Sequence, residues 1–152
     1  MTKALDRLRE LGFELPRPKA PVASYVPFVK SGNLLFVSGQ ISTGDAGVVT
    51  GRLGDTLNVV QGGNAAELAA LNLLSQVHYG ADIPLDSIKR VVKLTIFVNA
   101  TEAFTEHHLV ANGVSNILAA ILGDKGKHAR SSIGVSGLPF GAAVEVEGIF
   151  EV

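Results

Sequence analysis

The stretch AVEVEGIFEV at residues 143–152 alternates between aliphatic and mostly polar side chains. Val144, Val146 and Phe150 fall on one side, opposite Glu145 and Glu147. Because successive side chains of a strand point to opposite faces of a sheet, this alternation predicts a strand with one face in a core. The stretch IKRVVKLTIFVN at residues 88–99 repeats the pattern and predicts a second such strand. Its aliphatic side consists of Val92, Leu94, Ile96 and Val98.

Two segments beside these strands carry apolar residues at helical spacing instead. The first follows Asn64, which is expected to cap it, and ends near Gly80. Its apolar stripe is formed by Ala65, Leu68, Ala69, Leu71, Leu74 and Val77. The second closes at Gly123, and its stripe is formed by Phe104, Val110, Val114, Ile117, Leu118 and Ile121. Stripes of this width predict two long helices that pack against a sheet.

Three further strands complete the expected sheet. Residues 25–30 and 34–41 are β-prone and are separated by a turn at 31–33, which predicts a β-hairpin. Residues 130–136 form the next-to-last strand, and residues 42–57 are expected to be a glycine-rich surface loop with at most one edge strand. The order β-β-α-β-α-β-β is typical of an α+β fold with both helices on one face of the sheet. The opposite face is then uncovered.

The first 23 residues are expected to be an extension of a single domain at residues 24–152. A short amphipathic helix is predicted before Gly12, formed around Ala4, Leu5, Leu8 and Leu11. The segment after it is kept extended by Pro16, Pro18 and Pro21. Such a segment suits a linker that lies across the surface of the domain.

The composition of the 152 residues excludes several classes of protein. The 14 acidic and 13 basic side chains give a net charge of -1, which disfavours sequence-independent binding to nucleic acid. The absence of cysteine excludes a disulfide framework, a thiolate metal site and a cysteine nucleophile, and it fits a reducing cytosol. Residues 1–11 mix charges with leucine, so neither a signal peptide nor a membrane span is expected. We therefore expect a cytoplasmic protein that binds no nucleic acid and no membrane.

The uncovered face of the predicted sheet is where we expect the chemistry. If the aliphatic sides of the strands meet the helices, the residues that point away from them are Arg130, Ser132, Glu145 and Glu147, joined by Ser38 and Gln40. One interpretation is that these side chains simply face water. The same face also carries three large apolar side chains, Phe36, Phe97 and Ile149. Self-association would bury this apolar patch and leave Arg130 and Glu145 in a cleft between subunits.

Four short motifs occur in order from about residue 25 to residue 152. They are Ser38-Gly39-Gln40-Ile41, VVKLTIFV at 91–98, Ala129-Arg130-Ser131-Ser132, and Leu138-Pro139 followed by VEVE at 144–147. None of them is specific by itself. As an ordered set over most of the chain they resemble the RidA family of reactive-intermediate deaminases, also called the YjgF family. The extension and the length resemble a longer bacterial subgroup of that family.

The resemblance implies a chorismate-mutase-like (bacillus type) α+β fold, assembled as a homotrimer with three clefts between subunits. It also implies a hydrolase similar to the 2-iminobutanoate/2-iminopropanoate deaminases. These enzymes convert 2-imino acids, the tautomers of enamines, to 2-oxo acids and ammonia, and they need no cofactor. A non-catalytic regulatory or interaction protein that binds a small carboxylate on the same trimer is the alternative. The presence of both Arg130 and Glu145 favours the enzyme, because a binding protein needs only the arginine.

Individual residues match the functional positions of the family. Arg130 matches the arginine that grips the substrate carboxylate, and Glu145 matches the glutamate that orients or deprotonates the attacking water. The residues that match positions around the substrate are Tyr25, Ser38, Asn112 and Ser132. Ser132 stands where many deaminase members have cysteine, and its backbone is the group expected to bond to the imine nitrogen.

No metal site is expected. His107 and His108 are adjacent, so on a helix they point about 100° apart and cannot easily share one ion. His78 and His128 are isolated in the sequence. The glycine-rich loop at residues 44–54 lacks the strand-to-helix context and the lysine of a phosphate-binding loop.

Overall fold

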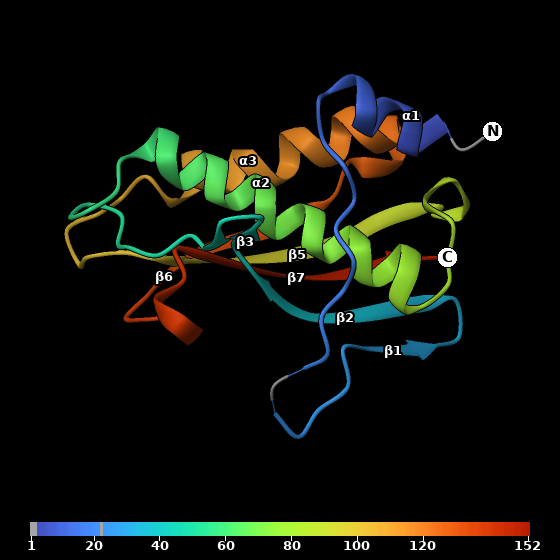
Figure 1. The fold of residues 1–152 in the computed structure, drawn as a ribbon, viewed down its shortest axis with the longest axis horizontal. Helices are drawn as coiled ribbons and strands as arrows, with labels where there is room; N and C mark the ends of the chain where they lie inside the picture. Colours follow the sequence, from blue (N-terminus) through green and yellow to red (C-terminus); the bar gives the residue numbers. More distant parts are fainter. Residues whose placement is uncertain (1–2, 22) are drawn as a thin grey trace.

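The fold is described by a computed structural model that covers residues 3–21 and 23–152, so Met1, Thr2 and Val22 of the expected extension lie outside the described residues. A five-stranded sheet carries two long helices on one face (Figure 1). The strands of this sheet are β1 (Phe28–Ser31), β2 (Leu34–Ile41), β5 (Arg90–Asn99), β6 (Ala129–Val135) and β7 (Val144–Glu151). The helices are α1 (Lys3–Glu10), α2 (Val59–Ser75) and α3 (His107–Leu122). The predicted α+β order of strands and helices is confirmed.

Shorter elements fill the connections. The glycine-rich loop holds a pair of strands, β3 (Thr43–Gly44) and β4 (Gly47–Val48), where at most one was predicted. Short helical turns are η1 (Gln76–Gly80), η2 (Leu85–Ser87), η3 (Gly123–Gly126) and η4 (Pro139–Gly141). Within residues 3–21 and 23–152, no helix is both long and apolar enough to cross a membrane.

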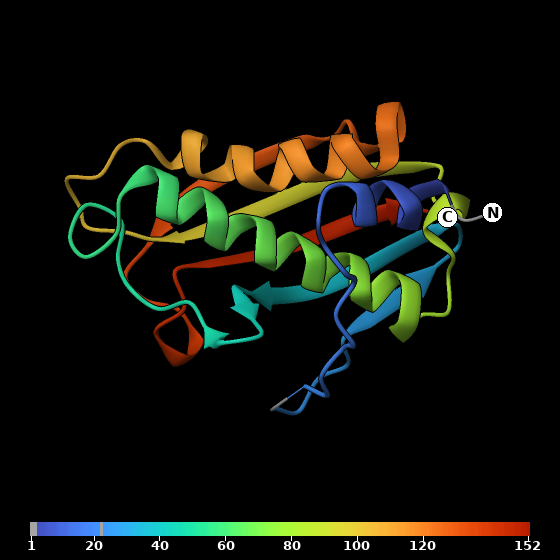
Figure 2. The ribbon, with the colours of Figure 1, turned by 45° about the horizontal axis from the view of Figure 1, so that its top comes forward.

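The last strand of the chain, β7, lies at the centre of the sheet, whose order is β1-β2-β7-β5-β6. It pairs antiparallel with β2 on one side and with β5 on the other. At the far edge β6 runs parallel to β5, and α3 makes the crossover between them. Figure 2 shows α2 and α3 lying across the same face of the sheet. The core between helices and sheet includes Leu73, Leu94, Ile96, Val114, Leu118, Val146 and Phe150.

The predicted aliphatic side of β5 is wrong at its first residue. Val91 is fully buried, while Val92 is only partly buried. The register with β7 shifts between Val91 and Lys93, which marks a β-bulge at Val92. An extra residue in a strand reverses the side-chain alternation, so a pattern read through a bulge assigns the wrong face.

The predicted orientation of β6 is also wrong. Arg130 and Ser132 pair in register with Leu94 and Ile96, whose side chains are buried under the helices. They therefore point to the helix side of the sheet. Ile133 points to the uncovered side and is 45% exposed. The aliphatic residue does not mark the core face here because β6 is an edge strand, on which either face can reach solvent.

The start of α2 lies earlier than predicted, with Asn58 rather than Asn64 as the cap. The side-chain oxygen of Asn58 accepts a hydrogen bond from the backbone N–H of Gln61 at 2.9 Å, and the Gln61 side chain accepts from the backbone N–H of Asn58 at 2.9 Å. This is a capping box. Glycine is unfavourable inside a helix, so the glycines at positions 62–63 placed the predicted start of the helix after them.

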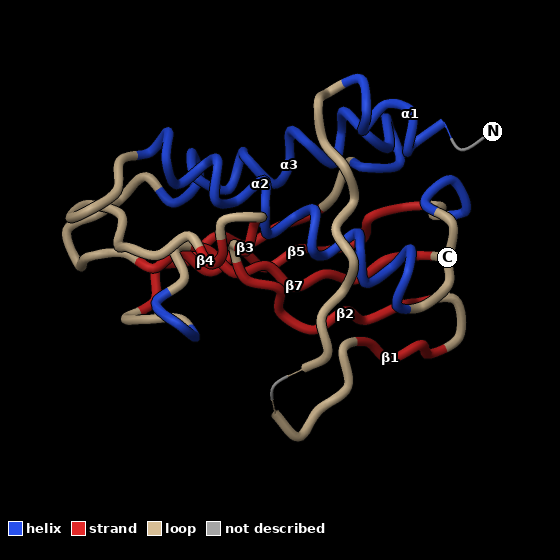
Figure 3. Tube along the Cα trace, viewed as in Figure 1, coloured by secondary structure: helices blue, strands red, loops and turns tan. Residues whose placement is uncertain are grey.

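The N-terminal extension lies on the two long helices. Its helix α1 adds two side chains to the common core, Ala4 and Leu8. Nη1 of Arg7 donates to the carbonyl of Ile121, near the end of α3, at 3.2 Å. The proline stretch then crosses α2 (Figure 3), where the hydroxyl of Ser75 donates to the carbonyl of Pro16. The extension thus spans from α3 across α2 toward β1 and β2.

Replacing Gly113 with Ala should lower the free energy of unfolding by about 1–3 kcal/mol. A Cβ atom at Gly113 would lie 2.2 Å from the carbonyl oxygen of Gly63, so α2 and α3 would have to move apart. The matched control is Gly63→Ala, whose Cβ atom would meet nothing within 4 Å. It should raise the free energy of unfolding by about 0.5–1 kcal/mol. Urea unfolding measures both changes, and equal effects would contradict the close helix contact.

Candidate functional site

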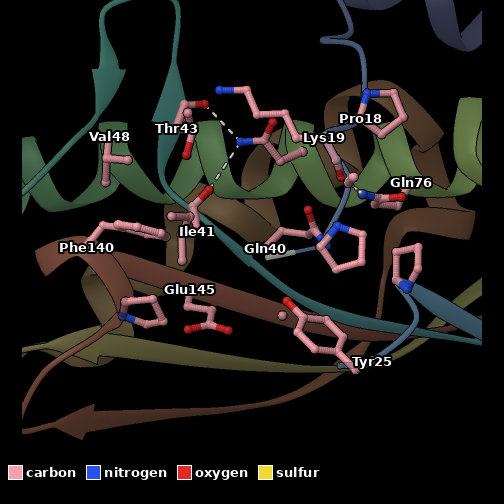
Figure 4. A pocket seen from close by; sticks show the side chains of 16 residues that line it. Pro18, Lys19, Tyr25, Gln40, Ile41, Thr43, Val48, Gln76, Phe140 and Glu145 are labelled. Carbon is pink, nitrogen blue, oxygen red and sulfur yellow. Dashed lines mark hydrogen bonds between the residues drawn. The ribbon is translucent and has the colours of Figure 1, made fainter. Parts of the chain in front are cut away.

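A cavity of about 370 Å³ opens where β2 runs past the end of β1, and the carboxylate of Glu145 lines it (Figure 4). Glu145 stands on β7 between Ile41 of β2 and Phe97 of β5. Figure 4 places Tyr25 and Phe140 on either side of the carboxylate. The rest of the lining comes from residues 18–21, Pro27, Gly39, Gln40, Ile41, Thr43, Val48, Asn72, Gln76 and Pro139. Two predicted site residues, Tyr25 and Glu145, therefore lie in one cavity.

Gly39 provides the space that the Glu145 carboxylate occupies. The register between β2 and β7 shifts between Val37 and Gln40, so β2 is irregular at this point. A Cβ atom at Gly39 would lie 1.9 Å from Oε1 of Glu145. Any other residue at position 39 would therefore displace the carboxylate from its place in the cavity.

The environment of Glu145 favours its protonated form. Burial raises the pKa of Glu145, and the negative charge of Glu147, two residues along β7, raises it further. No lysine or arginine forms an ion pair with Glu145 among the residues that the structure describes. A carboxylate with a raised pKa is a stronger base than an ordinary glutamate, which suits proton abstraction closer to neutral pH.

The extension forms one wall of the cavity. Nε2 of Gln76 donates to the carbonyl of Lys19 at 3.5 Å, and the guanidinium of Arg17 lies 3.9 Å from the centre of the Tyr79 ring. Gln76 and Tyr79 belong to η1, a π-helical turn, and such turns are frequent at functional sites. These contacts hold residues 17–19 at the cavity and bring Lys19 to its rim.

Phe140 contributes an aromatic wall in a strained conformation. Its backbone φ is 59°, in the left-handed region that bulky residues rarely adopt. The side chain is 67% exposed, so packing within the chain does not account for that conformation. Strain of about 1–3 kcal/mol at one residue is common at ligand-binding sites.

Arg130 lies at the other edge of the sheet, between β6 and α3. Its Nη1 donates to the hydroxyl of Ser115 at 2.8 Å, and its Nη2 donates to the carbonyl of His108 at 3.0 Å. Asn112 lies on the same side of α3, between these two contacts in the sequence. Ser132 is the next residue on this side of β6. The predicted residues Arg130, Asn112 and Ser132 thus come together as a second group, the arginine edge.

The two groups do not meet within one chain. β5 separates β6 from β7, and Arg130 and Glu145 point to opposite faces of the sheet. The prediction that Arg130 and Ser132 share the uncovered face with Glu145 was therefore wrong. Ser38 also stands apart, because its hydroxyl donates to the carbonyl of Val26 at 2.9 Å and it lines a separate hollow on the uncovered face.

Sequence reasoning missed three residues that take part in these groups: Ser115, His128 and Phe140. His128 precedes Arg130 by two residues and so lies on the same side of the strand, which was a usable signal. Ser115 lies one helical turn after Asn112, which was a second signal. Nothing in the sequence pattern indicated the backbone conformation of Phe140.

Comparison with known proteins gives the family. The family model described as endoribonuclease L-PSP matches residues 16–152. The chain belongs to this family, the RidA family. TCP17 of Trypanosoma cruzi is 46% identical to it over 147 residues, which cover 95% of this chain and 91% of TCP17. The crystal structure of Atu1372 from Agrobacterium tumefaciens is also 46% identical, with a TM-score of 0.92 over 98% of this chain and 92% of Atu1372.

A third similar structure is RidA from an Antarctic Psychrobacter, which is 24% identical with a TM-score of 0.61. The match covers 90% of this chain and 94% of that protein, and it shows the common fold. The predicted RidA family and its α+β fold are thereby confirmed. The RidA family model begins in the proline stretch, so α1 lies outside the matched residues.

Proposed function

We propose that the protein hydrolyses 2-imino acids to 2-oxo acids and ammonia, at sites that combine Arg130 of one subunit with Glu145 of another. The observation that carries the proposal is the carboxylate of Glu145, whose pKa is raised by burial in a cavity of small-molecule size. Membership of the RidA family supports the same reaction, because the resemblance to its deaminase members implies carboxylate binding by Arg130 and water activation by Glu145.

The reaction needs one anion-binding group and one base. The planar guanidinium of Arg130 can donate two parallel hydrogen bonds to the substrate carboxylate. Glu145 takes a proton from water while the water oxygen bonds to C2 of the protonated imine. Glu145 then passes that proton to the nitrogen and takes the proton of the C2 hydroxyl as the C2–N bond breaks, so ammonia leaves and the 2-oxo acid remains. Tyr25, Asn112 and the backbone of Ser132 are proposed to orient the substrate.

A homotrimer is proposed because the two groups lie on opposite faces of one chain. Every strand of the main sheet contributes an apolar side chain to the uncovered face: Val29, Phe36, Phe97, Ile133 and Ile149. Phe36 is 42% exposed and Ile133 is 45% exposed in the single chain. Packing this face against further copies would bury these residues and could bring Arg130 of one protomer to the Glu145 cavity of its partner.

Sedimentation equilibrium should give about three times the mass of one chain. The variant Ile133→Lys places a charge on the uncovered face and should shift the mass toward that of one chain. Val60→Lys is the matched control, because Val60 is 72% exposed on α2 and its replacement should leave the mass unchanged. A wild-type monomer at micromolar concentration would contradict the shared site.

A coupled assay tests the reaction. An amino-acid oxidase generates 2-imino acids, and their disappearance is timed with and without the protein. Faster disappearance supports the deaminase. Unchanged disappearance together with binding of a 2-oxo acid would instead support the non-catalytic carboxylate-binding protein.

The description of the family also names an endoribonuclease. Cleavage of RNA requires binding of a polyanion, which neither the net charge of -1 nor the three carboxylates on β7 favour. We therefore propose the imine substrate rather than RNA.

A further inference from the structure

The arginine edge contains two side chains that the proposed reaction does not use, Ser115 and His128. The hydroxyl oxygen of Ser115 lies 2.8 Å from Nη1 of Arg130 and 2.9 Å from Nε2 of His128. The other ring nitrogen, Nδ1 of His128, lies 2.6 Å from the carbonyl oxygen of Gly126. These contacts form a chain from η3 through β6 and α3 to the guanidinium.

The direction of each hydrogen bond follows from the chemistry of its partners. An arginine only donates, so the Ser115 oxygen accepts from Arg130. The hydroxyl hydrogen of Ser115 is then free to donate to Nε2 of His128, which must carry no proton. The proton of the neutral ring therefore lies on Nδ1, where the carbonyl of Gly126 accepts it. Each contact then joins one donor to one acceptor.

We propose that His128, acting through Ser115, is a positioning residue that holds the Arg130 guanidinium in the orientation that binds the ligand carboxylate. The Ser115 hydroxyl and the His108 carbonyl hold one N–H on each terminal nitrogen, which leaves the remaining N–H groups for a ligand. The assignment of a ligand carboxylate to Arg130 rests on the proposed function. The hydrogen-bond chain itself does not.

This chain of hydrogen bonds forms only while His128 is neutral. A protonated ring presents an N–H at Nε2, so the hydroxyl hydrogen of Ser115 loses its acceptor and a second positive charge lies beside the guanidinium of Arg130. Burial lowers the pKa of His128, the Gly126 carbonyl opposes this, and the charge of Arg130 lowers the pKa further. As the pH falls below the ordinary histidine value of 6.5, protonation of His128 should release Arg130 and weaken carboxylate binding.

Other charged groups do not change this argument. α3, which packs beside His128, carries no acidic side chain, lysine or arginine. Its titratable side chains are His107 and His108. From η3 and the residue after it, Asp124 and Lys127 form an exposed ion pair at 2.8 Å and largely neutralise each other, while Nζ of Lys125 donates to the carbonyl of Asp86 at 3.0 Å. Arg130 is thus the charge that acts on His128.

The test is calorimetric titration with pyruvate at about pH 8 and about pH 5.5. All variants carry Glu145→Gln, so that titration of Glu145 does not contribute. With His128 and Ser115 intact, affinity should fall at the lower pH. Ser115→Ala should bind about tenfold more weakly at the higher pH and lose the pH dependence, whereas Ser115→Thr, which keeps the hydroxyl, should behave like its parent. His128→Gln offers an acceptor that does not titrate, so it should bind well at both pH values.

Unchanged affinity and unchanged pH dependence in Ser115→Ala would overturn the proposal. Nitrogen NMR of the His128 ring gives a readout that needs no ligand. It should show the Nδ1-protonated tautomer at about pH 8 in the wild type and, because the Gly126 carbonyl remains, in Ser115→Ala, whose Nε2 resonance should shift because that nitrogen loses the hydrogen bond from Ser115. A wild-type ring protonated on Nε2 would overturn the hydrogen-bond chain. If NMR shows the predicted tautomer but calorimetry shows no binding of pyruvate, the result would count against the proposed function and would leave the hydrogen-bond chain supported.

Discussion

Exchanging Glu145 for Gln should reduce imine hydrolysis by about 10²–10⁴-fold while binding of a 2-oxo acid persists. Glutamine keeps the shape and the hydrogen-bonding capacity of the side chain and loses its basicity. It also removes a negative charge from the cavity, so affinity for an anion should stay the same or become slightly tighter. Hydrolysis and binding should be measured on the same preparation.

The matched control is Glu147→Gln, because Glu147 lies on the same strand and side of β7 but is exposed. It should keep nearly full activity. Since the charge of Glu147 raises the pKa of Glu145, its removal should lower that pKa. The base then loses its proton at a lower pH, so the acid limb of the pH-rate profile should shift toward lower pH. Equal losses in both variants would remove the general-base role from Glu145.

Mixed trimers of two inactive variants should recover activity. Arg130→Lys should lose most carboxylate binding, because an ammonium cannot make the two-pronged contact and the loss of such a charged contact costs about 2–5 kcal/mol. Glu145→Gln should lose turnover. If each site takes Arg130 from one protomer and Glu145 from the next, every mixed trimer contains one site with both residues intact. The expected hydrolytic activity of a mixed trimer is therefore about one third of that of the wild-type trimer, which has three intact sites.

Co-expression with two different affinity tags and purification through both isolates these mixed trimers. The control is a mixture of each variant with an inactive chain that carries both substitutions. It should stay inactive, because no site can then combine the two intact residues. Persistent inactivity of the Arg130→Lys and Glu145→Gln mixture would show that the two residues do not act across a subunit boundary.

The sequence predicts a strand correctly where the core buries one of its faces completely. The alternation of Val144, Val146 and Phe150 was sufficient for β7, because the helices bury that side completely. The same logic failed for β6, whose Ile133 faces the uncovered side. An edge strand exposes both of its faces, so the aliphatic residue no longer identifies the core. The bulge at Val92 is a backbone irregularity that alternation alone does not reveal.

For the candidate site, the sequence indicated which residues lie near one another better than it indicated their geometry. Tyr25 and Glu145 line one cavity, and Arg130, Asn112 and Ser132 lie together at the arginine edge. That these are two separate groups follows from the direction in which β6 faces, which is a property of the tertiary structure. The contact of Ser115 with His128 joins α3 to the segment before β6, so no spacing within one element indicates it.

The central position of β7 also bears on how the chain folds as it is synthesised. β7 follows the other strands in sequence, yet it alone joins the β1-β2 hairpin to the β5-β6 pair. Until β7 emerges, the inner edges of β2 and β5 lack the strand with which they pair. The apolar stripes of α2 and α3 also lack the side chains of β7 against which they pack. Such edges are prone to aggregation. The nascent chain should therefore depend on chaperones until residues 144–151 leave the ribosome, and early termination within them should yield insoluble product rather than a smaller folded domain.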